Sequence, residues 1–235
     1  MDKALALSQL IAKRRTEAHT TYHHLHSFDG GIWDCKHVVP WTTSASNVDA
    51  DLMIIGQDWA SEQFLREPKY NTAERVSARL SAGQDEYLPT NRRLKSLLRT
   101  HCGLEFAQTY ATDVLVFIKP GTMTGNVPMK DMLYCAETYT LPQIRIVKPR
   151  MVICLGAKTF NSVRRAMGMP DLKLSEACSP LAHSIDKGTG TEIYGVPHTG
   201  GLGHANAGGM ERVNQIWLGL ATRFDELNKR SSRTL

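Results

Sequence analysis

The sequence predicts a single α/β domain in which helices cover both faces of a mainly parallel sheet. Residues 52–55 and 151–155 are short apolar runs that each end at a glycine, a pattern typical of strands buried on both faces. Residues 157–167 follow the second run and have helical periodicity, as a βαβ unit requires. A chain of 235 residues is long enough to bury a substantial core as one domain.

The first predicted element is a helix over residues 2–27, where apolar side chains recur at helical spacing. The turn at Gly30-Gly31 is expected to end it, so residues 1–30 form an N-terminal helical segment. The polar stretch 42–47 is predicted to be a loop that leads into the first strand at residues 52–55.

Two further strands complete a predicted sheet of four. Residues 109–118 are rich in β-forming side chains, and residues 193–196 form a short segment before a glycine-rich stretch. Residues 129–147 are predicted to be helical, with a kink or interruption at Pro142 because a proline removes one helical hydrogen bond. Residues 226–235 are expected to form a polar tail.

Composition narrows the class of protein. The chain has 28 Lys and Arg residues against 23 Asp and Glu, and this net charge of +5 suits a polyanionic partner such as nucleic acid without requiring one. No apolar run approaches the roughly 18 residues of a membrane-spanning helix, and no secretory signal pattern follows Met1, so no membrane association is expected. Five cysteines without a C-x-x-C pair argue against a disulfide framework and favour a cytoplasmic location.

The carboxyl ends of the predicted strands are the places where an α/β sheet binds ligands. Gly56-Gln57-Asp58 comes directly after the first apolar run, so the Asp58 carboxylate is expected to face the crevice there. The alternative is that Asp58 or Ser61 caps the next helix by accepting hydrogen bonds from its first amides.

A histidine occupies the equivalent position after the last predicted strand. His198 enters a loop with five glycines between residues 200 and 209, and glycine lets the backbone approach a ligand closely. A neutral imidazole in this position can donate a hydrogen bond to an oxyanion that develops during a reaction. The alternative is a solvent-facing histidine in a surface loop.

Together, these two segments resemble the signature motifs of the uracil-DNA glycosylase superfamily. Gly56-Gln57-Asp58 resembles the water-activating motif G-Q-D-P-Y, and His198-x-x-x-Leu202 resembles H-P-S-P-L. Residues 206–209 are similar to the N-x-G-W ending of the single-strand-selective and mismatch-specific branches, and residues 135–156 are similar to a passage of the iron–sulfur branch. The resemblance spans residues 48–222.

The resemblance implies a three-layer α/β/α fold with a short central, mainly parallel four-stranded sheet, in a monomeric DNA-repair enzyme. The implied activity is that of a monofunctional DNA N-glycosylase, which hydrolyses the N-glycosidic bond of a flipped-out deaminated or damaged base, uracil or a related one. The implied partner is damaged DNA, as a duplex or a single strand. The reaction requires no metal ion and no organic cofactor.

The resemblance also implies roles for individual residues. Asp58 would orient the attacking water and stabilise positive charge on the sugar, and His198 would donate a hydrogen bond to the base oxygen. Leu202 would wedge into the space that the base vacates. The residues expected to form the base pocket are Gly56, Gln57, Trp59, Tyr70 and Asp113. The residues expected to contact DNA are Thr199, Gly200, Gly201, Leu202, Asn206, Arg92 and Arg93.

The sequence departs from the family pattern at several positions. The Pro and Ser of the His198 motif are missing, and Trp59 stands where the family has a Pro after Asp58. Only Cys35 and Cys135 stand where cluster thiolates would be, and Phe117 replaces another, so no iron–sulfur cluster is expected. Asp113 stands where the family has an asparagine, and an ionised carboxylate can accept from N3–H of uracil but repels O4. The identity of the recognised base therefore stays open. The family pattern places Asp113 at the end of its strand, whereas apolar periodicity starts the strand at Val114.

Three alternatives stand beside this interpretation. An unrelated doubly wound nucleotide enzyme is disfavoured, because neither G-x-x-x-x-G-K-[ST] nor G-x-G-x-x-G follows a predicted strand. The motif departures allow a protein of the same fold that binds DNA or a nucleotide with little or no catalysis. His19 and His23 are spaced i,i+4 and could share a metal ion, although a solvated or phosphate-facing helix end is the favoured interpretation.

Overall fold

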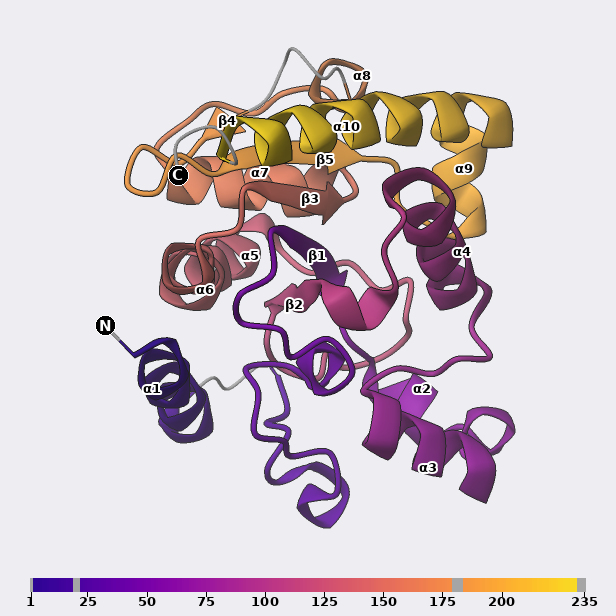
Figure 1. Ribbon diagram of the computed structural model, residues 1–235. Coiled ribbons are helices and arrows are strands. Elements are labelled where there is room, and N and C mark those ends of the chain that lie inside the picture. Colours follow the sequence, from indigo (N-terminus) through magenta and orange to yellow (C-terminus); the bar gives the residue numbers. More distant parts are fainter. Residues whose placement is uncertain (1, 19–21, 179–183, 232–235) are drawn as a thin grey trace.

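The computed structural model describes residues 2–18, 22–178 and 184–231, and it has the α/β architecture that the sequence predicts (Figure 1). A five-stranded sheet has helices on both of its faces. The strand order is β2-β1-β3-β5-β4, and the first four of these strands run parallel. The strands are Leu52–Asp58 (β1), Tyr110–Leu115 (β2), Met151–Leu155 (β3), Ser184–Ile185 (β4) and Glu192–Val196 (β5).

Helices connect the parallel strands along the chain. The connection from β1 to β2 contains three of them, the next contains two, and the one after β3 leads through two short helices to β4. The helices are Lys3–Thr16 (α1), Glu62–Arg66 (α2), Ala73–Ala82 (α3), Pro89–Leu97 (α4), Met129–Cys135 (α5), Leu141–Val147 (α6), Ala157–Ala166 (α7), Leu174–Ala177 (α8), Gly201–Asn206 (α9) and Met210–Ser231 (α10).

The sheet has five strands rather than the expected four. The additional strand, β4, is two residues long and pairs antiparallel with β5. It extends one edge of the sheet and leaves the order of the four parallel strands unchanged. A strand this short has no apolar pattern of its own, which is why the sequence did not predict it.

The two helices α7 and α10 cover opposite faces of β5. Gly195 faces α7, since a Cβ at this position would lie 2.9 Å from the Phe160 ring. Glu192 accepts hydrogen bonds from Arg223 of α10 at 2.6 and 2.9 Å. Because successive side chains of a strand point to opposite faces, residues 192 and 195 face opposite ways and β5 lies between the two helices.

Strand β2 differs from both placements that the sequence suggested. It covers Tyr110–Leu115, so Asp113 lies inside the strand and neither at its end nor before its start. All six residues of β2 are buried, including this acid. The parallel register pairs Asp113 with Gly56 of β1, where the apolar run of that strand ends. The register therefore brings the Asp113 carboxyl group next to Gly56 on the neighbouring strand.

The N-terminal helix is shorter than expected, and the prediction of a helix over residues 2–27 is wrong in its second half. α1 ends at Thr16, and Glu17 already has an extended backbone. Farther along, His23 exchanges two backbone hydrogen bonds with Ile118, at 3.0 and 2.9 Å. Threonines and histidines, which have low helix propensity, follow α1 in the sequence, and at His23 pairing with another segment takes the place of helical bonding.

The helical stretch before β3 contains a wide turn where the sequence predicts an interruption. α5 passes through the π-helical turn Ala136–Thr140 into α6, and Pro142 lies in the first turn of α6. A proline has no N–H to donate to the preceding turn, and a wider turn absorbs this loss. The expected interruption at Pro142 is therefore confirmed as a change of helical pitch.

The last helix of the chain is longer than expected. α10 continues to Ser231, so the predicted polar tail does not begin at residue 226. Its buried face includes Trp217 and Leu220, whereas Met210 and Leu218 are exposed on its outer face. Of the helices that the structure describes, none combines the length and the hydrophobicity needed to cross a bilayer.

Candidate functional site

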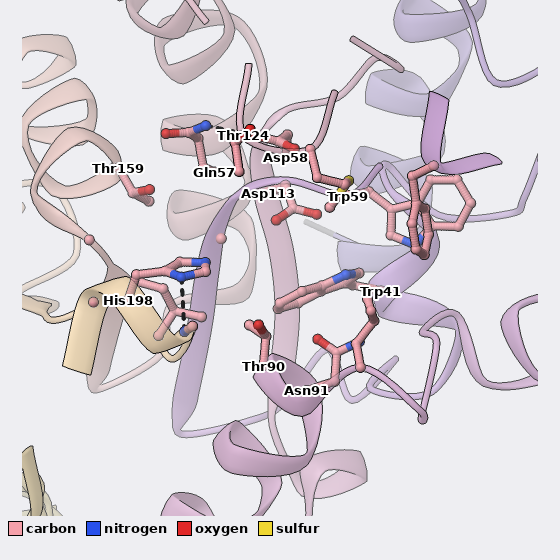
Figure 2. A pocket seen from close by; sticks show the side chains of 18 of the residues that line it. Trp41, Gln57, Asp58, Trp59, Thr90, Asn91, Asp113, Thr124, Thr159 and His198 are labelled. Carbon is pink, nitrogen blue, oxygen red and sulfur yellow. Dashed lines mark hydrogen bonds between the residues drawn. The ribbon is translucent and has the colours of Figure 1, made fainter. Parts of the chain in front are cut away.

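A cavity of about 610 Å³ opens where the parallel strands β1, β3 and β5 end, with β2 contributing from inside the sheet (Figure 2). This is the edge at which open α/β sheets bind ligands. Most residues that the sequence singles out line this one cavity. They are Gly56, Gln57, Asp58, Trp59, Asp113, His198, Gly200, Gly201 and Leu202.

Asp113 lies directly against Gly56 in the cavity wall. A Cβ at residue 56 would lie 2.1 Å from Asp113 Oδ1, so only glycine leaves room for the carboxyl group. The indole of Trp41 lies 3.5 Å from the same position. Neither oxygen of Asp113 has a hydrogen-bond partner in the described chain, although the side chain is fully buried. An unpaired polar group in a cavity wall is a group that a ligand can satisfy.

The surroundings of Asp113 favour its protonated form. Burial raises the pKa of Asp113 well above the usual range of an aspartate. The negative charge of Asp58 raises this pKa further, and the positive charge of Lys119 opposes both effects. A protonated carboxyl group carries one O–H donor and one acceptor oxygen, whereas the ionised group only accepts.

Asp58 is the last residue of β1 and lines the cavity instead of capping a helix. Ser61 is the cap of α2, because its hydroxyl accepts a hydrogen bond from the Phe64 amide. Of the two caps that the sequence allows, only Ser61 has this role. The Asp58 carboxylate accepts a hydrogen bond from Gln57 Nε2 at 2.7 Å, so the two polar side chains of the motif hold each other in place.

Lys119 is a buried cation of the site that the sequence did not single out. Its Nζ lies 3.1 Å from both carboxylate oxygens of Asp58. It also donates to the main-chain carbonyls of Met123 and Gly125, at 2.5 and 3.3 Å. These contacts tie the loop after β2 to the end of β1. A lone lysine after an apolar strand has no distinctive pattern, so only the fold reveals its partners.

His198 comes from the loop after β5 and, in Figure 2, lies on the other side of Asp113 from Trp41. Its Nδ1 accepts a hydrogen bond from the Gly200 amide at 3.0 Å, so a neutral ring carries its proton on Nε2. Burial lowers the pKa of His198, and the charges of His204 and Lys119 lower it further against the opposing effect of Asp58. The neutral ring is favoured, and Nε2–H can donate to a ligand.

The position of His198 explains two of the glycines that follow it. A Cβ at Gly203 would lie 2.0 Å from the His198 carbonyl oxygen, which is backbone and cannot move aside. A Cβ at Gly200 would lie 2.9 Å from Nδ1 of the imidazole ring. These glycines allow α9 to begin in contact with the histidine, as the glycine-rich pattern suggested.

Aromatic side chains form much of the cavity wall. Trp41, Trp59 and Phe64 line it and are buried, and Trp59 Nε1 donates to the Gly83 carbonyl at 2.9 Å. Tyr70, which was expected in the base pocket, does not line the cavity. It packs against Phe64 instead, with 4.9 Å between the ring centroids and the rings tilted by 38°. Flat, buried rings of this kind suit a planar ligand.

A second Gly-Gln-Asp segment, residues 83–85, contributes to the same cavity. Gln84 lines it and is buried, and neither Nε2 nor Oε1 has a hydrogen-bond partner among the described residues. Asp85 is paired, since Arg75 donates to its carboxylate from Nε and Nη2 at 3.0 and 2.7 Å. The repeated tripeptide is a signal that could have pointed to Gln84, but it follows helix α3 and not a strand.

Lys158 brings an amine to the cavity from another direction. It lies half-buried in the first turn of α7, and its Nζ donates to Asn126 Oδ1 at 2.5 Å. Burial lowers the pKa of Lys158, and the positive charge of Lys119 lowers it further while Asp58 opposes both effects. No sequence pattern distinguishes this lysine from the others.

The glycine-rich loop is only partly placed as expected for DNA contacts. Leu202 lines the cavity and is 76% exposed, so it lies at the opening. Gly200 and Gly201 lie beside it. Thr199, which was also expected to contact DNA, is fully buried and does not line the cavity. Successive side chains of an extended backbone point in opposite directions, so Thr199 faces the core where its neighbour His198 faces the cavity.

The remaining residues expected to contact DNA lie outside the cavity. Asn206 is exposed at the end of α9. On α4, Arg92 is exposed and Arg93 is half-buried. Burial lowers the pKa of His204 on α9, and the charge of Arg93 lowers it further. The helices α4 and α9 lie near each other (Figure 1). These side chains could bind phosphates beside the cavity opening.

The possible metal ligands do not gather into a site within the described ranges. There, no three His, Cys, Asp or Glu side chains come close enough to hold a metal ion. Cys35 and Cys135 are free thiols, and burial raises the pKa of Cys135 to about 12. His19 lies outside the described residues, and His23 lies 3.4 Å from a carboxylate oxygen of Glu62.

No family model matches the chain, and no curated protein matches it either. The cavity combines a carboxylate beside a lysine, a neutral histidine, a buried carboxyl group and aromatic walls. Such a set can hold a planar polar ring and stabilise charge that develops when a bond to that ring breaks.

Proposed function

We propose that the protein is a DNA N-glycosylase that hydrolyses the bond between deoxyribose and a flipped-out deaminated or damaged base, uracil or a related one. The observation that carries this proposal is the convergence of Asp58, Asp113 and His198 on one cavity. The resemblance to the uracil-DNA glycosylase superfamily supports it, and a three-layer α/β/α arrangement with four parallel strands is compatible with that family's fold. In this proposal the protein acts as a cytoplasmic monomer without a cofactor.

Asp113 reads the edge of the base in this proposal. A protonated carboxyl group offers the same donor and acceptor pair as the amide of an asparagine. Uracil presents an O4 acceptor and an N3–H donor, which match that pair. The raised pKa of Asp113 thus removes the conflict between an acidic side chain and a uracil-like base.

Asp58 and His198 act on the two charges that appear when the bond breaks. The sugar becomes positive, and the Asp58 carboxylate stabilises that charge and orients the attacking water. The base becomes negative, and Nε2–H of His198 donates to its oxygen. Loss of one such preorganised donor commonly lowers the rate by about 10²–10³. Gln57 keeps the Asp58 carboxylate in position through its hydrogen bond.

The base must leave the helical stack before it can enter the cavity, at a cost of a few kcal/mol. Leu202 lies exposed at the opening, where an apolar side chain can fill the vacated space in the duplex. Trp41 and Phe64 provide flat surfaces against which the extruded base can stack. Arg92 and Arg93 are placed to bind phosphates beside the opening.

A panel of oligonucleotides with one lesion each tests this proposal. Duplex and single-stranded forms carrying uracil, hypoxanthine or xanthine are incubated with the protein and then treated with hot alkali, which cleaves the strand at an abasic site. Cleavage at the uracil position is expected, with no cleavage of the undamaged control. Intact strands for every base would contradict the proposal.

The alternative is a binding protein of the same fold that recognises damaged DNA or a nucleotide without excising a base. One observation favours it. The Lys119 ammonium lies against Asp58 and offsets the negative charge on which the proposed hydrolysis depends. In this alternative the protein binds lesion-bearing DNA tightly and releases no base.

A further inference from the structure

We propose that Lys158 forms an imine with the C1′ aldehyde of the abasic deoxyribose that occupies the cavity after base excision. The ligand class is a ring-opened 2-deoxyribose aldehyde within DNA. This inference goes beyond the proposed hydrolysis, and it rests on the proposed function only for the origin of the abasic product. Imine formation would add a second, covalent step to the hydrolysis of the glycosidic bond.

The place of Lys158 in the cavity carries the inference. The residue follows Gly156 at the carboxyl end of β3 and lines the cavity together with Asp58. Its amine also interacts electrostatically with the Asp58 carboxylate, which acts on the sugar in the proposed hydrolysis. The amine therefore shares the compartment into which C1′ must be brought. Its one hydrogen-bond partner in the described chain is the neutral amide of Asn126, which a ligand can replace.

The other lysine near the site cannot take this role. Lys119 is buried, and its Nζ contacts Asp58 and two main-chain carbonyl groups. All three of its donors are therefore engaged. Of the lysines that the structure describes, Lys158 alone lines the cavity.

An amine must lose its proton before it can attack a carbonyl carbon. Desolvation and a neighbouring cation are the two influences that prepare lysines for imine formation in enzymes. Lys158 has both, because burial and the charge of Lys119 lower its pKa. Its position in the first turn of α7 adds the positive end of the helix dipole, which acts in the same direction.

The chemical step balances without an oxidant or a reductant. The lone pair of Nζ forms a bond to C1′, and the aldehyde oxygen takes up a proton from the amine to give a carbinolamine. Loss of the hydroxyl group as water leaves a C=N bond. A C2′ proton then passes to water, the electron pair of the C2′–H bond forms a C2′=C3′ double bond, and the 3′-phosphate departs with the electron pair of the C3′–O bond. Hydrolysis of the imine returns the free amine.

Borohydride trapping tests the inference. A duplex oligonucleotide with one preformed abasic site is incubated with the full-length chain and sodium borohydride, which reduces an imine to a stable amine. Lys158→Ala is compared with Lys130→Ala, which removes an exposed lysine of α5 that does not line the cavity. We expect an adduct whose modified peptide contains Lys158. Its yield should fall about tenfold or more in Lys158→Ala and stay unchanged in Lys130→Ala.

The outcomes separate this inference from the proposed function. No adduct, or an adduct on the N-terminal amine or another lysine, overturns the imine. Thermal melting verifies that Lys158→Ala is folded, and Lys158→Arg replaces it if it is not. Because the abasic site is preformed, trapping does not depend on base excision. An adduct at Lys158 without excision of any base contradicts only the glycosylase proposal, and excision without an adduct contradicts only the imine.

Discussion

The Asp113 carboxyl group of β2 occupies the space that a Cβ at residue 56 of β1 would need, with Oδ1 only 2.1 Å from that position. The two residues are paired in the sheet register. The glycine makes room for the acid, and the acid in turn presents two unpaired oxygens in the cavity wall. This pairing explains why the apolar run of β1 ends in a glycine at that point.

Gly56→Ala is expected to destabilise the protein by roughly 1–3 kcal/mol, because an added methyl group overpacks a rigid, buried contact. Combining it with Asp113→Ala removes the colliding carboxyl group. The double variant should therefore lose less stability than the two single variants added together. Urea denaturation of the four proteins measures this coupling. Strictly additive losses would show that the two side chains do not compete for space.

Asp113→Asn is expected to gain stability relative to the parent as the pH rises. The fold raises the pKa of Asp113, so above about pH 4 the folded chain keeps a proton that the unfolded chain has released. The parent therefore loses stability as the pH rises from the unfolded pKa toward the folded one. Asparagine does not titrate and escapes this loss. Urea denaturation at about pH 4, 6 and 8 measures the difference, and a difference that is independent of pH would mean that Asp113 is ionised in the fold.

Gln84→Met is expected to weaken base excision without weakening the fold. It removes a buried amide that has no partner in the described chain, so the free energy of unfolding should stay level or rise by about 1 kcal/mol. Asn91→Leu is the matched control, since Asn91 also lines the cavity but donates to the Asp85 carbonyl at 2.9 Å. That variant should lose stability. A parental excision rate in Gln84→Met would exclude Gln84 from base recognition.

Leu202→Ala is expected to slow excision from duplex DNA more than from single strands. The side chain is exposed at the cavity opening and would act by filling the space that the base leaves, which matters only where bases are stacked and paired. The ratio of the two excision rates is the measurement. The control is Leu218→Ala, which truncates an exposed leucine of α10 that does not line the cavity. It should leave the ratio unchanged. An equal loss on both substrates would argue against the wedge.

Much of the fold could be predicted because buried parallel strands leave continuous apolar runs in the sequence. The runs at residues 52–55 and 151–155 predicted β1 and β3 for this reason. The end of α1 could not be predicted, since the pairing of His23 with Ile118 joins segments that lie far apart along the chain. β4 is too short for any pattern to mark it.

The candidate site divides in a similar way. Asp58 and His198 could be found because the ends of parallel strands meet at one edge of the sheet. The sequence could not point to Lys119, Gln84 or Lys158, since their place in the site depends on segments far from them in the chain. The protonation of Asp113 also lay beyond the sequence, because the burial that raises its pKa is a property of the packed fold.

The excision rate of Asp58→Asn on a uracil-containing oligonucleotide, measured beside its affinity for the same DNA, tests the central claim most directly. Asparagine keeps the shape of Asp58 but removes the charge that stabilises the sugar cation, a contribution made in the transition state. Thermal melting verifies that the variant is folded despite the loss of its ion pair with Lys119. We expect excision to fall about 10²-fold or more while affinity stays at the parental level. Full excision by Asp58→Asn would contradict the catalytic role of this carboxylate.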